Sequence, residues 1–176
     1  MRDTAGPVPP VVWLTGLSGS GKTTLGMGLV AALRDRGLTS ILIDGDDLRA
    51  GLCRDLDFSR EGRRENVRRA ACLAALLHRQ GVWPVVALIA PYRADRDLGR
   101  ALVAPARYHE IHVAAPLTVC RARDPKGLYA AEVRGTAPLT GLGDPYEPPE
   151  NPDLIIATDR CSPAEGIAQA ITSLGM

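Results

Sequence analysis

The chain has 176 residues, the length of one domain, and 45 % of them are hydrophobic, which is enough to bury a sizeable core. With 21 Lys and Arg against 20 Asp and Glu, the net charge is +1, so a general polyanion-binding surface is not implied and no nucleic acid partner is expected. The longest apolar stretch, around Val82 to Ala90, is too short to span a bilayer and contains Pro84, so no membrane partner is expected.

The four cysteines are widely spaced and none forms a C-x-x-C pair. This spacing predicts reduced thiols in a cytoplasmic protein and argues against a zinc site. No N-terminal signal is visible, because Asp3 and three prolines interrupt the first ten residues. Residues 1–10 are expected to form a flexible arm, and residues 11–176 a single domain.

The first predicted element is a buried strand over Val11–Thr15, and a glycine-rich loop follows it. Gly16 to Thr23 fit the pattern G-x-x-x-x-G-K-[ST], which is typical of a loop that cradles phosphates. Its glycines let the backbone fold tightly and point successive N–H groups inward. Lys22 can then reach the β- and γ-phosphates, and the Thr23 hydroxyl can bind Mg²⁺. The predicted ATP-binding residues of the loop are Gly16, Ser18, Gly19, Ser20, Gly21, Lys22, Thr23 and Thr24.

Helices and strands alternate along the rest of the chain. Their periodicity predicts a doubly wound α/β fold, a mostly parallel sheet of about five strands sandwiched by helices. The predicted strands after the first are Ser40–Ile43, Val85–Ile89, Glu110–Val113 and Leu154–Ala157. The predicted helices are Lys22–Arg36, Asp47–Leu52, Arg60–Gln80, a helix ending near Val103, Leu117–Arg121 and Pro163–Leu174.

Two carboxylates follow the second predicted strand, in Asp44-Gly45-Asp46. Because ligands of such sheets bind outside the carboxyl ends of the strands, this pair is expected beside the phosphate loop. One carboxylate could hold Mg²⁺ through water, and the other could orient or deprotonate an acceptor hydroxyl. A D-x-D pair by itself is more often solvated surface.

Phe58 is the only phenylalanine and lies in a polar, arginine-rich stretch before the helix from Arg60. It could be a hydrophobic staple at the helix entrance, or a ring that stacks on a base with Arg49 and Arg63 nearby for anionic groups. Both interpretations stay open from composition. The sequence places Arg63 and Asn66 near the buried stripe of that helix, whereas Arg64, Arg68 and Arg69 are interpreted as solvated surface or phosphate steering.

The segment Asp124–Pro152 is too long to be an idle loop in a compact domain. It carries Lys126, one of only two lysines in the chain, and a proline-rich end. A mobile lid that keeps water from the transferred phosphoryl group is the favoured interpretation. A rigid surface loop is the alternative.

Together these segments resemble the adenylyl-sulfate kinase (APS kinase) family from about Val11 to Asp159. Many proteins share the phosphate loop alone, so the order of the other segments makes the resemblance specific. The similar segments are Gly16–Thr24 (GLSGSGKTT), Asp44–Arg49 (DGDDLR), Phe58-Ser59, Arg63 with Asn66, Pro91–Arg96 (PYRADR), Ala122–Tyr129 (ARDPKGLY) and Asp144–Pro149 (DPYEPP).

The resemblance implies a P-loop kinase domain over residues 11–176 that uses ATP and Mg²⁺ to phosphorylate the 3′-hydroxyl of adenosine 5′-phosphosulfate (APS), giving PAPS. A homodimer is expected as well. It implies Lys22, Asp46 and Lys126 as catalytic residues, Thr23 and Asp46 as metal ligands, and Arg121 or Arg123 beside the ATP adenine. The implied acceptor-binding residues are Asp44, Asp46, Arg49, Phe58, Arg63, Asn66, Ile89, Ala90 and Leu139.

The chain departs from the family pattern in the acceptor half of the site. Ala90 stands where a serine, considered a phosphate-accepting position, is usual, and Leu139 replaces the phenylalanine that helps sandwich the acceptor's adenine. Ala137 takes the place of a lysine, and Ala50 and Cys53 the places of a histidine and an asparagine. The alternative function is therefore a kinase of the same type that phosphorylates a different small molecule, in specialised metabolism.

Overall fold

The computed structural model describes residues 9–124, 127, 129 and 145–176. Five strands form one sheet in the order β2-β3-β1-β4-β5, and every neighbouring pair is parallel, so the predicted "mostly parallel" sheet is fully parallel in this part of the chain. The strands are β1 Val11–Thr15, β2 Ser40–Asp44, β3 Trp83–Ala87, β4 Tyr108–Ala114 and β5 Leu154–Ala157.

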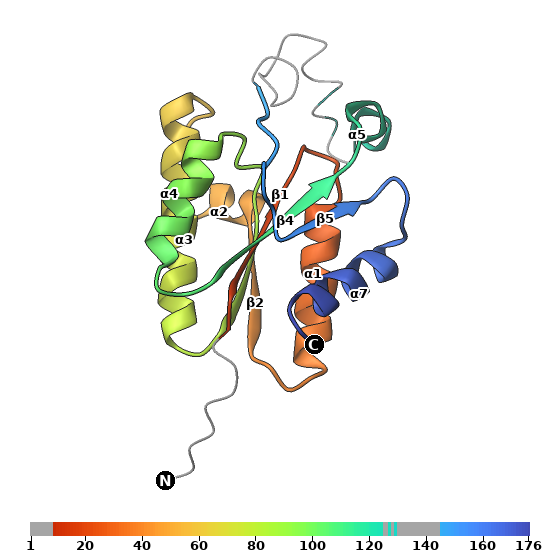
Figure 1. Ribbon diagram of the computed structural model, residues 1–176. Coiled ribbons are helices and arrows are strands. Elements are labelled where there is room, and N and C mark those ends of the chain that lie inside the picture. Colours follow the sequence, from red (N-terminus) through yellow and green to blue (C-terminus); the bar gives the residue numbers. More distant parts are fainter. Residues whose placement is uncertain (1–8, 125–126, 128, 130–144) are drawn as a thin grey trace.

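Helices cover both faces of the sheet, which confirms the doubly wound architecture (Figure 1). α3 and α4 pack together on one face, and α1 and α7 pack together on the other. The helices are α1 Lys22–Arg34, α2 Gly45–Ala50, α3 Arg60–Arg79, α4 Arg93–Val103, α5 Leu117–Arg123 and α7 Pro163–Ser173. No helix in the described ranges is both long and apolar enough to cross a membrane.

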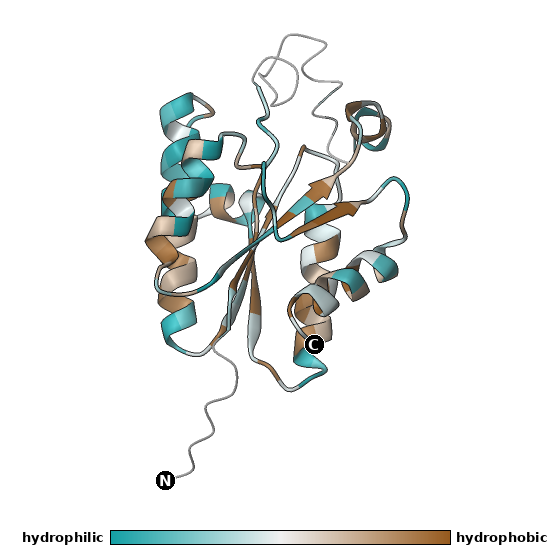
Figure 2. Cartoon of the chain, in the orientation of Figure 1, coloured by the Kyte–Doolittle hydropathy of each residue, from teal (hydrophilic) through white to brown (hydrophobic). Residues whose placement is uncertain are grey.

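The central strand β1 divides the core into two halves. Val11 and Trp13 belong to the cluster under α3 and α4, whereas Val12 and Leu14 belong to the cluster under α1 and α7. This alternation follows from the two-residue period of a strand, and both faces are apolar because helices bury both. Figure 2 shows the hydrophobic residues concentrated on the strands and on helix surfaces that turn toward them.

β3 differs most from the prediction, since it begins at Trp83 rather than Val85. Pro84 cannot donate a ladder hydrogen bond. In the structure Pro84 pairs with Ile41 of β2, and the pairing of β3 with β1 begins only at Val85. A proline near the start of a strand is therefore compatible with the sheet.

The helix directly after β2 also starts earlier than predicted. α2 begins at Gly45, because the Asp44 carboxylate accepts a hydrogen bond from the Asp46 backbone N–H (2.9 Å) and so caps the helix. Ser59 caps α3 in the same way, as predicted, through the Gly62 N–H (3.0 Å). Both caps place the first turns of these helices at the carboxyl edge of the sheet (Figure 1).

Candidate active site

The phosphate loop connects β1 to α1 and depends on close backbone packing at its glycines. A Cβ on Gly16 would lie 2.4 Å from the Val113 carbonyl oxygen, so a larger residue would push the loop away from β4. Gly19 has φ +74° and faces the Cys120 carbonyl, where a Cβ would lie only 2.8 Å from the oxygen. The loop conformation therefore requires glycine at these two positions for both space and backbone angle.

Lys22 folds over this loop from the first turn of α1. Its Nζ donates to the carbonyl oxygens of Gly16 (2.8 Å) and Leu17 (2.7 Å), which holds the ammonium above the loop backbone. The side chain is largely buried, and it lines the cavity described below. A positive charge at the amino terminus of a helix makes this point strongly favourable for phosphate.

The two carboxylates after β2 have different surroundings. Asp44 is buried and accepts a hydrogen bond from the Thr23 hydroxyl (2.8 Å), so the end of β2 and the start of α1 are joined at the loop. Asp46 is exposed in the first turn of α2 and lines the cavity. The chain thus brings Thr23, Asp44 and Asp46 to one edge of the sheet, as the sequence predicted.

A cavity of about 900 Å³ adjoins the phosphate loop, and two further groups of its lining residues, which we call its two arms, come from different elements. One arm runs beside α5 and the segment after β5. Thr158 joins this arm to the loop, since its hydroxyl donates to the Ser20 carbonyl (2.7 Å). The residues of this arm are Arg123, Thr158, Cys161, Ser162 and Pro163.

Arg123 is fixed in that arm by hydrogen bonds to the Thr158 hydroxyl (3.1 Å) and carbonyl (2.6 Å). It lines the cavity, whereas Arg121 is exposed and is not among the lining residues. Of the two arginines predicted beside the adenine, the structure therefore places only Arg123 at the site. The sequence did not point to Thr158, Cys161, Ser162 or Pro163, because their only signal was a position after the last strand.

The second arm contains Phe58, Arg49, Arg63 and Asn66. The Phe58 ring is 54 % exposed, with the guanidinium carbon of Arg49 at 4.1 Å and that of Arg63 at 5.6 Å from its centroid. A hydrophobic staple would pair Phe58 with the residue four positions after the Ser59 cap, and that residue is Arg63. The structure therefore favours Phe58 as a surface for a ligand ring.

Electrostatics suit an anionic ligand in this arm. Arg63 and Asn66 are buried, and the Asn66 side-chain oxygen has no hydrogen-bond partner among the described residues. Burial, together with the charge of Arg63, lowers the pKa of Arg49 from its usual value. Two guanidinium groups held this close repel each other, so an anion between them would be stabilised by both.

The part of the cavity wall that follows β3 includes Ile89 and Ala90. Ala90 is buried and has φ +41°, a left-handed conformation that costs an alanine on the order of 1–3 kcal/mol. Hydrogen bonds hold it there: Arg96 Nη1 donates to the Ala90 carbonyl (2.7 Å), and the Thr15 hydroxyl donates to the Ile89 carbonyl (2.6 Å). The wall is therefore tied to both β1 and α4.

Two segments that are far apart in the sequence, Pro91–Arg96 and the segment around Glu147, meet behind this wall. The Glu147 N–H donates to the Pro91 carbonyl (2.8 Å), and Arg96 Nη2 donates to the Glu147 carbonyl (2.8 Å). Arg96 also forms a buried ion pair with Glu110 of β4 (3.0 Å). The described end of the segment Asp124–Pro152 is thereby anchored, while Lys126 and Leu139 lie outside the described residues.

These features define the class of P-loop kinases: a phosphate loop after β1, carboxylates after β2, and a two-armed cavity that reaches both. A model of the family described as adenylylsulphate kinase matches residues 8–157. The chain belongs to the adenylylsulphate kinase family.

Individual relatives agree with this assignment. The chain is 51 % identical to an adenylyl-sulfate kinase of Shewanella amazonensis, over 84 % of this chain and 75 % of that protein. It is 46 % identical to one of Paraburkholderia xenovorans, over 93 % and 92 %. It is also similar to the structure of the Mycobacterium tuberculosis APS kinase in complex with AMPPNP and APS, with a TM-score of 0.93 and 40 % identity over 97 % of this chain and 100 % of that one.

Proposed function

We propose that this protein transfers the γ-phosphoryl group of ATP to the 3′-hydroxyl of APS, giving PAPS and ADP. The observation that carries the proposal is the cavity, whose lining includes Lys22 and Asp46 together with the residues of both arms. ATP fits the arm beside Arg123 and Thr158, with its phosphates on the loop. APS fits the other arm, with its base on Phe58 and its anionic groups near Arg49 and Arg63.

Mg²⁺ fits the residues present on the ATP side. The Thr23 hydroxyl and the Asp46 carboxylate are the oxygen donors that this ion prefers, and Asp44 positions Thr23 through their hydrogen bond. When bound, the ion would neutralise charge on the phosphates. Thr23 and Asp46 are the residues that would hold it, and Asp46 would also orient the acceptor hydroxyl.

The choice of acceptor is tested by titrating APS and following ADP release with a coupled assay. We expect saturable, APS-dependent turnover by the wild type. Phe58→Ala should raise the KM for APS severely, because it removes the only aromatic ring proposed to stack on the acceptor's adenine. Leu139→Phe should lower that KM by no more than about tenfold, since an added aromatic contact contributes roughly 0.5–1.5 kcal/mol.

A different acceptor is the second candidate, favoured by Ala90 and Leu139 standing where the family usually has serine and phenylalanine. A panel of small hydroxyl compounds in the same assay separates the two. If APS elicits no ADP release from the wild type or from Leu139→Phe, while another compound does, the second function replaces the first.

Ala90 leads to a prediction about the route of transfer. Without a hydroxyl at this position, a phosphoserine cannot form there, and we expect direct transfer from ATP to the acceptor. Protein incubated with γ-labelled ATP should therefore carry no stable label on residues 89–92, as measured by peptide mapping. Label recovered in that segment would contradict direct transfer.

Three expectations from the sequence remain proposals. A homodimer can be checked by light scattering, and a cytoplasmic location by fractionation. The four cysteines are free thiols in the structure, which is compatible with a reducing compartment. Closure of residues 124–152 over the cavity, with Lys126 contacting the phosphates, is proposed as the step that excludes water.

A further inference from the structure

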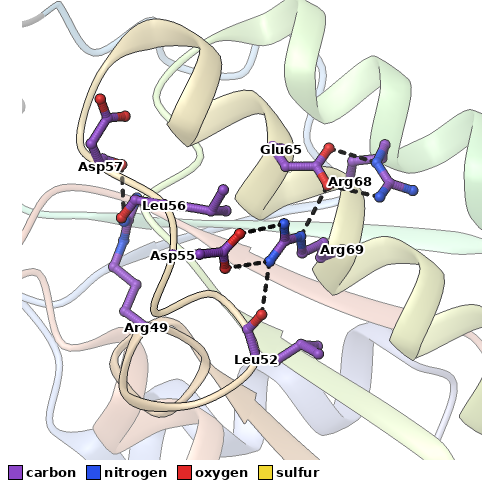
Figure 3. Close-up of polar contacts among 8 residues, drawn as sticks. All are labelled: Arg49, Leu52, Asp55, Leu56, Asp57, Glu65, Arg68 and Arg69. Atoms are coloured by element: carbon purple, nitrogen blue, oxygen red, sulfur yellow. Dashed lines mark hydrogen bonds and ion pairs between the residues drawn. The ribbon is translucent and has the colours of Figure 1, made fainter.

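We propose that Arg69 is a positioning residue for the acceptor: it fixes the segment 52–58 from behind and so holds Phe58 in the cavity. The inference rests on the proposed function and concerns the acceptor arm. From the sequence, Arg69 is interpreted as solvated surface or phosphate steering. In the structure its side chain is 25 % exposed, and each of its three guanidinium nitrogens donates to a protein group (Figure 3).

The contacts of Arg69 join α3 to the segment before it. Its Nη1 and Nη2 donate to the two carboxylate oxygens of Asp55 (2.7 and 2.8 Å), a bidentate pair. Nη1 also donates to the Leu52 carbonyl (2.8 Å), and Nε donates to Glu65 (2.9 Å). Figure 3 shows the Arg69 guanidinium between Asp55 and Glu65, with the Leu52 carbonyl below it.

The segment needs such a restraint because burial holds it at few points. It lies between α2 and α3, and Leu52 and Phe58 are both more than half exposed. Cys53 is fully buried and Leu56 packs partly against the core, so only these two side chains anchor it apolarly. A segment with few buried contacts opens readily unless polar contacts close it.

Two other arginines hold the same segment from the cavity side. Arg49 Nη1 donates to the carbonyls of Leu56 (3.1 Å) and Asp57 (3.0 Å), and Arg63 Nε donates to the Phe58 carbonyl (2.9 Å). Both line the cavity, so an anionic acceptor competes for their donors. Arg69 does not line it, and its contacts can persist when a ligand is bound.

Glu65 keeps Arg69 in place and offers a matched control. Its carboxylate accepts from both Arg68 and Arg69, and these hydrogen bonds, that of Arg68 first, lower the pKa of Glu65 to about 2. Arg68 contacts only Glu65 and the Cys72 sulfur in the described structure, and has no contact with residues 52–58. Arg68 and Arg69 are thus adjacent and both pair with Glu65. Only Arg69 also donates hydrogen bonds to the segment 52–58.

The experiment compares Arg69→Ala with Arg68→Ala in the full-length protein. Arg69→Ala should raise the KM for APS about three- to tenfold, with kcat and the KM for ATP within about twofold of wild type. Arg68→Ala should leave all three unchanged. Asp55→Ala should reproduce part of the effect of Arg69→Ala, and the double variant should be no worse than Arg69→Ala, because the Asp55 pair is among the contacts that Arg69→Ala removes.

Amide hydrogen exchange provides a readout that does not depend on activity. Exchange of residues 52–59 should accelerate in Arg69→Ala and Asp55→Ala but not in Arg68→Ala, with the melting temperatures of all variants recorded. Unchanged exchange in Arg69→Ala, or faster exchange with an unchanged KM for APS, overturns the proposal. If the wild type does not phosphorylate APS, the proposed function fails separately, and the exchange comparison alone decides whether Arg69 holds the segment.

Discussion

Replacing Lys22 with alanine is expected to lower kcat on the order of 10³-fold while the protein remains folded. The ammonium lies over the phosphate loop, held by the carbonyls of Gly16 and Leu17, where we expect it to stabilise charge on the transferred phosphoryl group. The loop's conformation depends on its glycines and α1 on its apolar stripe, so the fold should survive. The measurement is kcat at saturating ATP and APS, with circular dichroism and thermal melting as checks of folding.

Lys22→Arg is the control that separates charge from shape. A guanidinium keeps the positive charge but is planar and broader, and it cannot replace a compact ammonium at the end of a flexible stem. We expect a large loss here as well. A folded Lys22→Ala protein with near-normal kcat would rule out the kinase assignment altogether.

Asp46→Asn is expected to lower kcat by about 10²- to 10⁴-fold, the range for a group that assists proton transfer. Asp46 lines the cavity at the start of α2, and we propose that its carboxylate contacts Mg²⁺ and the acceptor hydroxyl. Asparagine has nearly the same shape but lacks the charge. The assay is kcat at saturating substrates, with ATP-analogue binding measured by calorimetry to show that the ATP arm is intact.

Asp47→Asn is the matched control, since Asp47 lies in the same helical turn but does not line the cavity. It should retain kcat within about twofold, as most surface substitutions do. Equal losses in the two variants would point to the charge at the start of α2 rather than to a role for Asp46 in transfer.

The sequence predicted the architecture closely because strand and helix periods are local. The glycines in the loop after β1, the continuous apolar run of β1 and the serine cap before α3 each report on a few neighbouring residues. The boundaries that differ, such as the start of β3 at Trp83, depend on which strand pairs with which. That pairing is not visible in a single segment.

In the acceptor arm, some features could be predicted from the sequence and others required the tertiary structure. Phe58, Arg63 and Asn66 were expected near a ligand, and the cavity contains all three. Whether Phe58 is a staple or a ligand surface was undecidable from composition. The structure favours the second, because Arg63 stands where a staple partner would be and the ring is largely exposed.

By itself, the sequence determined the phosphate loop, the carboxylates after β2 and the doubly wound fold, since each follows from short-range spacing and backbone preference. Only the tertiary structure decided that Thr158, Cys161, Ser162 and Pro163 line the arm beside Arg123, that Arg96 ties the wall at Ala90 to Glu147, and that Arg69 holds Asp55. These contacts join residues 6 to more than 100 positions apart. They exist because parallel crossovers bring the carboxyl ends of distant strands to one edge, and no local pattern records which side chains meet there.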